Sequence, residues 1–256
     1  MNHTANAPFS EIAQAPRRLL VEIAGVTLWQ ATLAQPDATI AQWRDWLTPE
    51  ERQRAERVTR PSLRGRAFAV RALLRGLLAQ ALDVSPAALR FQSDTHGRPH
   101  LVSPFANGAI RDFNLSHSGD NLLVGILHHT APPSWQRIGV DLESLRRSRD
   151  IARLAQRVLC AREQRTLEGL AREECRSRFL HYWVLKEAFS KAVGAGFSLG
   201  FETMDFDLDA APHPRARALP KPYCPNDWAL QFLPVSASLV AALALGNQTS
   251  LPTPDA

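Results

Sequence analysis

The segment Phe179–Lys191 constrains the fold most, because its pattern is compatible with one local structure only. It contains no glycine or proline, it is rich in good helix formers, and its apolar side chains recur at helical spacing. Tyr182 and Phe189 lie on one apolar stripe, whereas Glu187 and Lys191 stand one turn apart on another. The segment therefore predicts a helix that packs into a core and carries an acid and a base side by side.

The lysines make this helix a candidate functional element. Lys186, Lys191 and Lys221 are the only lysines of a chain that otherwise takes its positive charge from arginine. Most glutamate–lysine pairs one turn apart are surface ion pairs of little energetic consequence. Two of the three lysines lie beside Glu187 and among large aromatic residues, which favours a functional cluster over a surface pair.

A second acidic group lies upstream, in a strand predicted at Ile138–Glu143. Alternation along the strand puts Asp141 and Glu143 on the same side, about 6–7 Å apart. Such carboxylates repel each other unless water or a cation lies between them. The alternative is two exposed acids neutralised by nearby arginines, but oxygen ligands of this kind suit Mg²⁺, with Glu187 as a third ligand.

Taken together, these motifs resemble those of the phosphopantetheinyl transferases. That family carries Gly-Ile/Val-Asp-x-Glu followed by Trp-x-x-Lys-Glu-Ala/Ser-x-x-Lys, and the chain has matching residues at 139–143 and 183–191. The resemblance covers roughly residues 26–245 and is to the two-halved, Sfp-type branch. It implies an α+β fold of two similar halves related by a pseudo-twofold axis, an active site in the cleft between them, and a monomer.

The order of predicted elements supports two halves, because strand, long helix, short strand and hairpin occur twice. The N-terminal half is expected at 18–130 and the C-terminal half at 137–246, with flexible tails at 1–17 and 247–256. The long helices are predicted at 62–82 and 174–193. Thr48 begins a further helix, since Pro49 follows it and Glu51 completes a capping box.

An excess of arginine marks the N-terminal half. The stretch 52–75 holds eight arginines and one acid, Glu56. A solvated surface explains most of them, but a few are better explained as a phosphate site, because arginine grips phosphate oxygens bidentately. The position relative to the family pattern selects Arg66 first, then Arg60 and Arg64.

Two further segments resemble coenzyme A contacts of the family. Gly97-Arg98-Pro99 is similar to a turn whose basic residue reaches the 3′-phosphate of coenzyme A, and the alternative is a plain turn. The segment around Ser116 and His117 resembles one that contacts the nucleotide end. Carried over, the resemblance names Arg98, Ser116 and His117 as coenzyme A ligands.

The resemblance also implies catalytic roles. Lys191 would reach the pyrophosphate of coenzyme A. For Lys186 there are two alternatives, the same contact or an exposed position. Glu187 is the candidate base for the carrier serine, directly or through a metal-bound water, and Glu163 is the second candidate. Glu163 closes a segment, Leu159–Glu163, that departs from the family pattern at two positions, and the alternative is an ordinary glutamate in the first turn of a helix.

Composition limits the cellular setting and the partners. The chain has 45% hydrophobic and 21% charged residues, an ordinary globular composition. The beginning of the chain shows no apolar signal segment, and the run Ala237–Leu245 is too short to cross a bilayer. Three cysteines fit neither a disulfide framework nor a metal spacing, so we expect a cytoplasmic protein without membrane contact.

The sequence thus predicts an enzyme that moves the phosphopantetheine arm of coenzyme A to a serine of an apo acyl or peptidyl carrier protein, with Mg²⁺ or Mn²⁺. The products would be holo carrier and adenosine 3′,5′-bisphosphate. A non-catalytic coenzyme A or nucleotide binder is the alternative, although it would not need the three carboxylates. The net charge of +5 also suits nucleic acid, but no nucleic-acid-binding signature is present and no such partner is expected.

Overall fold

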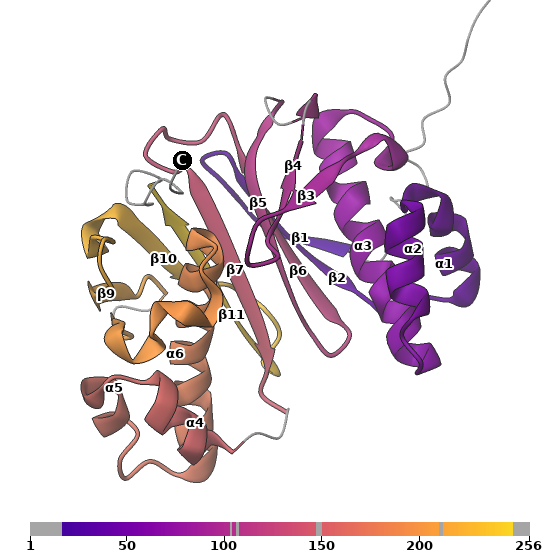
Figure 1. Cartoon of the computed structure of the whole chain (residues 1–256). Helices are drawn as coiled ribbons and strands as arrows, with labels where there is room; N and C mark the ends of the chain where they lie inside the picture. Colours follow the sequence, from indigo (N-terminus) through magenta and orange to yellow (C-terminus); the bar gives the residue numbers. More distant parts are fainter. Residues whose placement is uncertain (1–16, 103, 106–107, 147–149, 210–211, 248–256) are drawn as a thin grey trace, which may run out of the picture.

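The computed structural model describes residues 17–102, 104–105, 108–146, 150–209 and 212–247 (Figure 1). Helices and antiparallel strands alternate along this part of the chain, which confirms the α+β class. The predicted tails lie outside the described residues, except Arg17, which begins the first strand, and Asn247. The pseudo-twofold relation of the halves stays a prediction.

The first sheet has four antiparallel strands in the order β1-β2-β6-β5. They are β1 (Arg17–Ile23), β2 (Val26–Thr32), β5 (Ile110–Ser118) and β6 (Asn121–His128). The sequence predicts a single strand at 26–33 near the beginning, whereas the structure has the β1–β2 hairpin. Its two-residue turn, Ala24-Gly25, has φ values of 46° and 79°, the left-handed conformation that tight hairpins require.

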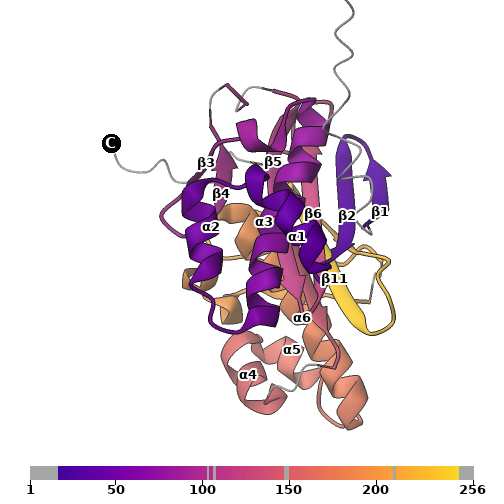
Figure 2. The same cartoon turned by 90° about the vertical axis from the view of Figure 1, so that its right-hand side faces the viewer.

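Helices of the N-terminal half cover one face of this sheet, as the side view shows (Figure 2). They are α1 (Asp37–Trp43), α2 (Pro49–Glu56) and α3 (Pro61–Leu82). The capping box predicted for α2 is present: the Glu51 amide donates to Thr48 Oγ1 at 3.3 Å, and the Thr48 amide donates to Glu51 Oε2 at 3.0 Å. A short hairpin of β3 (Phe91–Ser93) and β4 (Pro99–Leu101) completes this half.

The second sheet has three antiparallel strands in the order β10-β11-β7. They are β7 (Arg137–Ser144), β10 (Trp228–Phe232) and β11 (Leu239–Gly246). The helix α6 (Arg172–Val193) packs on β7 and β11 and is buried over much of its length, as the sequence predicts. It ends at Gly194, whose φ of 76° gives the expected glycine cap.

Shorter elements surround α6. They are α4 (Ile151–Val158), α5 (Ala161–Arg165), β8 (Asp205–Asp207) and β9 (Arg215–Ala218). The helix expected over 160–171 ends at Arg165, and Gly169 beyond it has φ 74°, which interrupts helical geometry. Within the described residues, no helix has both the length and the apolar character needed to span a membrane.

β5 and β7 lie side by side where the two sheets meet (Figure 1). Alternate side chains of β5 accept hydrogen bonds from alternate backbone amides of β7, at distances between 2.9 and 3.3 Å. We call this set the β5–β7 ladder; its acceptors are Asp112, Asn114, Ser116 and Ser118, and its donors are Ile138, Val140, Leu142 and Ser144. The ladder sets the register between the two halves.

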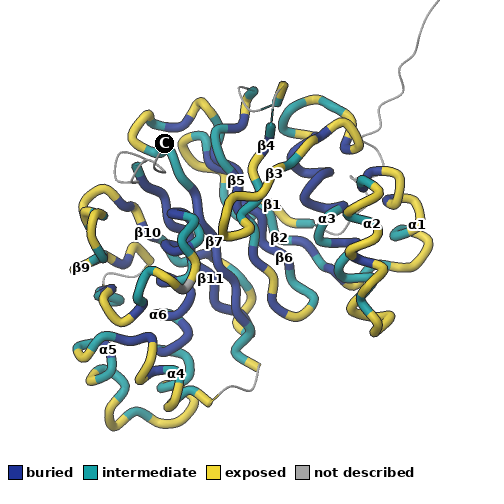
Figure 3. Tube along the Cα trace, in the orientation of Figure 1, coloured by how far each residue is buried: buried dark blue, intermediate teal, exposed yellow. Residues whose placement is uncertain are grey.

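A shared apolar core reinforces this junction. Each half has its own buried cluster, and a third cluster combines residues of β2 and β6 with residues of β7 and β11. Figure 3 shows these central strands as mostly buried and the outer helices as partly exposed. Gly125 on β6 allows the close approach, because a Cβ there would lie 2.9 Å from side-chain atoms of Ile138 and Val140.

Candidate active site

The two carboxylates of β7 both point toward β5, as strand alternation predicts. Asp141 is 4% exposed and Glu143 is 8% exposed. Ser116 Oγ donates to Asp141 Oδ1 at 2.7 Å, and Ser118 Oγ donates to Glu143 Oε2 at 3.2 Å. The opposite half of the molecule therefore holds both acids in place.

Asp141 has two very different oxygens. Its Oδ1 receives the Ser116 hydroxyl and also pairs with Lys191 Nζ at 2.6 Å. Lys191 Nζ donates in addition to Ser116 Oγ at 2.9 Å. The other oxygen, Oδ2, is buried and has no hydrogen-bond partner among the residues that the structure describes. A buried acceptor without a partner is rare in folded proteins and calls for an explanation such as an absent ion.

Gly139 explains how α6 reaches this site. A Cβ at Gly139 would lie 1.9 Å from the Ala188 carbonyl oxygen and 2.5 Å from the Ala192 amide nitrogen. The backbone of α6 thus rests directly on β7, a contact that only glycine permits. The close packing brings Lys191 to Asp141, with the half-buried Glu187 one helical turn earlier.

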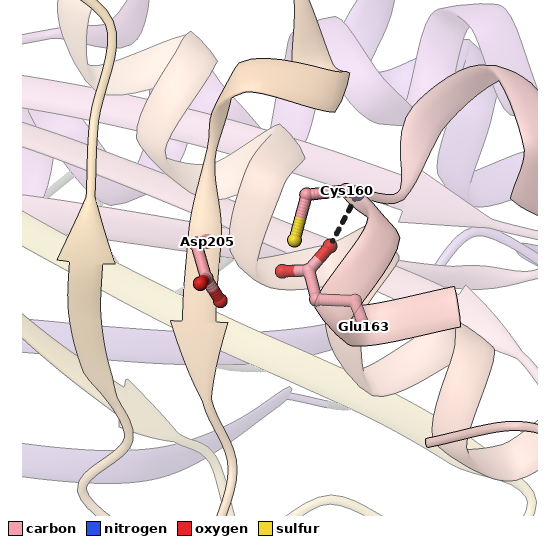
Figure 4. Close-up of side chains that lie close together, drawn as sticks. All are labelled: Cys160, Glu163 and Asp205. Carbon is pink, nitrogen blue, oxygen red and sulfur yellow. Dashed lines mark hydrogen bonds between the residues drawn. The ribbon is translucent and has the colours of Figure 1, made fainter. Parts of the chain in front are cut away.

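The predicted ligands Asp141, Glu143 and Glu187 therefore come from β7 and α6, but they are not drawn tightly together. Among the described residues, the atoms that gather within 4.8 Å as a group able to hold a metal belong instead to Cys160, Glu163 and Asp205. Figure 4 shows the carboxylate of Glu163 next to Cys160, with Asp205 on the neighbouring strand β8.

Protein cations already neutralise that second group. Glu163 pairs with Lys186 at 2.7 Å, and both side chains are fully buried. Asp205 pairs with Arg162 at 2.5 Å. Burial raises the pKa of Glu163 and lowers the pKa of Lys186, while their mutual attraction opposes both shifts. Burial also raises the pKa of the Cys160 thiol, so a thiolate ligand is disfavoured.

This arrangement corrects two predictions. Lys186 Nζ also donates to the carbonyl oxygens of Phe201 at 2.8 Å and Met204 at 2.7 Å, so the structure contradicts its expected contact with a phosphate. Glu163 accepts from the Phe206 amide at 2.9 Å and is inaccessible to any substrate, so it is wrong as a second candidate base. Both residues stabilise the interior of the C-terminal half.

A cavity of about 650 Å³ opens at the ends of β5 and β7, and residues of both halves line it. We call it the inter-half cavity; its lining residues are Leu33, Leu63, Arg66, Ala67, Val70, His117, Ser118, Gly119, Ser144 and Arg146. The structure thus brings together Arg66 and His117, which the sequence selected from separate motifs. Arg66 pairs with Asp120 at 2.5 Å, and both side chains are partly exposed.

Arg98 lies elsewhere and is only 8% exposed. Its guanidinium pairs with Asp112 at 2.6 Å and donates to the carbonyl oxygens of Ile138 at 2.9 Å and Ala192 at 3.0 Å. It also donates to the carbonyl oxygen of Lys191. Arg98 therefore joins β5, β7 and the end of α6, which does not support its expected role as a ligand of the 3′-phosphate.

Ser116, Arg64 and Arg60 also depart from the predicted nucleotide site. The Ser116 hydroxyl is 6% exposed and is engaged with Asp141, so it is not available to a nucleotide. Arg64 donates to the carbonyl oxygens of Val58 and Thr59 ahead of α3. Arg60 is exposed at the start of α3 and does not line the inter-half cavity.

The sequence reasoning missed a second cavity, of about 420 Å³, which residues of α2, α3, β3 and β4 line. We call it the arginine-lined cavity, because Arg54, Arg71, Arg75 and Arg90 line it together with Phe91, Pro99 and residues around the start of α2. The arginine run contained the signal, but the face on which each side chain lies depends on how α2 packs against α3. A further cavity, of about 640 Å³ among α4, α5 and α6, contains no predicted site residue.

Comparisons with known proteins match both halves of the chain to one family. A family model described as the 4'-phosphopantetheinyl transferase superfamily matches residues 137–244, and a model of the N-terminal part of a 4'-phosphopantetheinyl transferase matches residues 28–126. The chain is 33% identical to the 4'-phosphopantetheinyl transferase HetI of Nostoc sp., over 87% of this chain and 88% of that protein. It is 26% identical to the 4'-phosphopantetheinyl transferase Sfp of Bacillus subtilis, over 64% and 67% of the two chains.

Among solved structures, a holo-(acyl-carrier-protein) synthase of Bacillus anthracis in complex with CoA aligns with 43% of this chain and 95% of its own, at 22% identity and a TM-score of 0.34. That likeness is too distant to inform the site. The two family models together span both halves of the molecule, and the HetI match extends across most of both chains. The chain therefore belongs to the 4'-phosphopantetheinyl transferase superfamily.

Proposed function

We propose that this enzyme transfers the phosphopantetheine arm of coenzyme A to a serine of an apo acyl or peptidyl carrier protein, in a reaction that depends on Mg²⁺. The observation that carries the proposal is the buried Asp141 carboxylate where the two halves meet: Lys191 pairs with its Oδ1, and its Oδ2 has no hydrogen-bond partner among the described residues. We also propose that the halves span 18–130 and 137–246 and that the protein is cytoplasmic. It would act as a monomer, because both halves of one chain contribute to one site.

The residues present fit a divalent cation. Asp141, Glu143 and Glu187 would hold Mg²⁺ or Mn²⁺, since carboxylate oxygens are the ligands that these hard cations prefer. The orphaned Oδ2 of Asp141 is the atom that such an ion would satisfy. When bound, the cation would offset the charge that develops on the pyrophosphate as its bridging bond breaks.

Coenzyme A would bind along α3, which lines both the inter-half cavity and the arginine-lined cavity. Arg66, His117 and Lys191 would contact phosphate oxygens nearest the carboxylates. The side chains of Arg54 and Arg71 would hold a further phosphate of the nucleotide end, because the guanidinium fork matches phosphate geometry. Arg60 remains a candidate on the exposed start of α3.

The transfer step makes one bond and breaks one. The hydroxyl oxygen of the carrier serine would bond to the phosphorus that carries the pantetheine arm, and the bond from that phosphorus to the bridging oxygen would break. Adenosine 3′,5′-bisphosphate would leave with the bridging oxygen. Glu187 would take the serine proton, since a neutral hydroxyl is a weak nucleophile and needs a base. The positive net charge of the chain favours docking of an acidic carrier.

The test is the intact mass of an apo carrier protein after incubation with this protein, coenzyme A and Mg²⁺. The expected gain is roughly 340 Da, the mass of one phosphopantetheine added as a covalent modification. The variant Glu187→Gln should lower the transfer rate by roughly 10²-fold or more, since it removes the proposed base. Removal of metal with a chelator should abolish transfer and leave the circular dichroism spectrum unchanged.

Glu174→Gln is the matched control, because Glu174 lies on the same helix but is exposed far from the carboxylates. It should transfer at the wild-type rate. Failure to modify acyl and peptidyl carriers, with coenzyme A still bound in equilibrium dialysis, would indicate the non-catalytic binder instead. Full activity of Glu187→Gln would remove Glu187 as the base.

A further inference from the structure

Ser116 and Ser118 make the same pair of hydrogen bonds to β7. Each hydroxyl donates to a carboxylate, at 2.7 Å from Ser116 to Asp141 and 3.2 Å from Ser118 to Glu143. Each also accepts from the backbone amide of the residue that follows that carboxylate, at 3.3 Å and 3.1 Å. The repeat ties both the orientation of each acid and the local backbone of β7 to β5.

Both hydroxyls are inside the protein, with exposed fractions of 6% for Ser116 and 2% for Ser118. A serine hydroxyl has one proton to donate and two lone pairs to accept with. Ser116 uses its proton on Asp141 and accepts from the Leu142 amide and from Lys191 Nζ at 2.9 Å. Protein groups therefore use the whole hydrogen-bonding capacity of the Ser116 hydroxyl, and its one proton is donated to the Asp141 carboxylate.

As a result of these contacts, the two carboxylate oxygens of Asp141 have different surroundings. Ser116 and Lys191 both bind Oδ1, at 2.7 Å and 2.6 Å, which leaves Oδ2 buried and unpartnered. Leaving a buried acceptor unsatisfied costs folding free energy. Such a cost is offset when the oxygen binds a cation, and the hydroxyl prevents the carboxylate from turning away from it.

We propose that Ser116 and Ser118 are positioning residues that orient Asp141 and Glu143 for a divalent cation. The inference rests on the proposed function, since it assumes that these carboxylates are metal ligands. The N-terminal half would then control, through β5, how tightly the carboxylates of the C-terminal half bind the metal. The register of the β5–β7 ladder then decides whether the metal site forms.

The ladder also supplies a matched control. Asn114 Oδ1 accepts from the Val140 amide at 3.0 Å, in the same pattern and with similar burial, and its side chain has no hydrogen bond to a carboxylate within the described part of the chain. Asn114→Ala therefore removes a rung of the ladder without touching a proposed ligand. It should lower stability, because a buried amide loses its partner, and should leave metal affinity unchanged.

The experiment titrates Mn²⁺ alone into the full-length protein and counts free Mn²⁺ by electron paramagnetic resonance. Ser116→Ala and Ser118→Ala should each weaken binding roughly 10- to 100-fold, the range found when partners of metal ligands are removed. Ser116→Thr keeps the hydroxyl and should retain most of the affinity. Thermal unfolding of each variant shows that the protein measured is folded.

Equal Mn²⁺ affinity of Ser116→Ala and Asn114→Ala would overturn the inference, because the loss would then be a general effect of the ladder. Wild-type protein that binds no Mn²⁺ would overturn the inference and the proposed metal ligands together. Carrier modification is measured by mass on the same preparations. A weakened Mn²⁺ site in Ser116→Ala without any transfer by the wild type would defeat the proposed function and leave the inference standing.

Discussion

Two lysines of α6, only five positions apart, have opposite roles. Lys186 is buried against Glu163 and two backbone carbonyls, whereas Lys191 is partly exposed and pairs with Asp141. A helix turns about 100° per residue, so positions 186 and 191 face different sides of it. The ion pair of Lys186 is therefore structural, and that of Lys191 belongs to the site.

Lys186→Met should lower the free energy of unfolding by about 3–5 kcal/mol, because it leaves the Glu163 carboxylate buried without its cation. Urea unfolding followed by tryptophan fluorescence measures the change. The double variant Lys186→Met, Glu163→Gln should recover much of the loss, since neither charge remains. A folded double variant without transfer activity would contradict a purely structural role for the pair.

At the scale of elements, the contact between α6 and β7 determines the geometry of the site. Gly139 lies under the Ala188 carbonyl and the Ala192 amide, so the helix can approach the strand closely. The same contact sets the distance between Lys191 on the helix and Asp141 on the strand. The glycine of the carboxylate motif is thus required for packing, not for the chemistry itself.

Gly139→Ala should destabilise the protein by about 3 kcal/mol or more, because the new methyl group would overlap backbone atoms that cannot move independently. Gly65→Ala is the matched control. Gly65 lies within α3, and no atom of the described residues beyond its own helix backbone and chain neighbours lies within 4 Å of a Cβ placed there. That change should stabilise the helix by about 0.5–1 kcal/mol. Chemical denaturation of both variants tests the pair, and a Gly139→Ala protein as stable as the wild type would refute the packing argument.

At the scale of the whole molecule, Arg98 connects the two halves. It starts from the turn before β4 and reaches Asp112 on β5, the Ile138 carbonyl on β7 and the Ala192 carbonyl on α6. These contacts add to the β5–β7 ladder and to the shared apolar core. These contacts hold the two halves in a fixed position relative to each other, and the inter-half cavity lies between them.

Arg98→Leu should lower the unfolding free energy by about 3–5 kcal/mol, because the largely buried Asp112 carboxylate would lose its cation and keep only the hydrogen bond from the Ile138 amide. Arg66→Leu should cost at most about 1 kcal/mol, since Arg66 pairs with Asp120 in a partly exposed position. Thermal unfolding and calorimetric titration with coenzyme A separate the two. Arg66→Leu is expected to weaken binding, and a stable Arg98→Leu protein that has lost coenzyme A affinity would restore Arg98 as a phosphate ligand.

Much of the local structure follows from the sequence alone. The capping box of α2, the buried α6 with its Gly194 cap and the β5–β6 hairpin were all predictable, because the residues that decide them are neighbours in the chain. Strand alternation likewise placed Asp141 and Glu143 on one side of β7. These features need only the geometry of one helix or one strand.

The roles of individual polar residues needed the tertiary structure. Lys186, Glu163, Arg98 and Ser116 occur in motifs that suggested contact with substrate, yet protein groups from other elements occupy their polar atoms. The contact of Ser118 with Glu143 and the grouping of side chains around the arginine-lined cavity could not be derived from the sequence, because both depend on which strand or helix packs opposite. The sequence by itself determined the family and the main helices and strands, and it named the candidate acids. Only tertiary packing decided which charges are buried as pairs and which face the cavities, since burial is a property of contacts between segments distant in the chain.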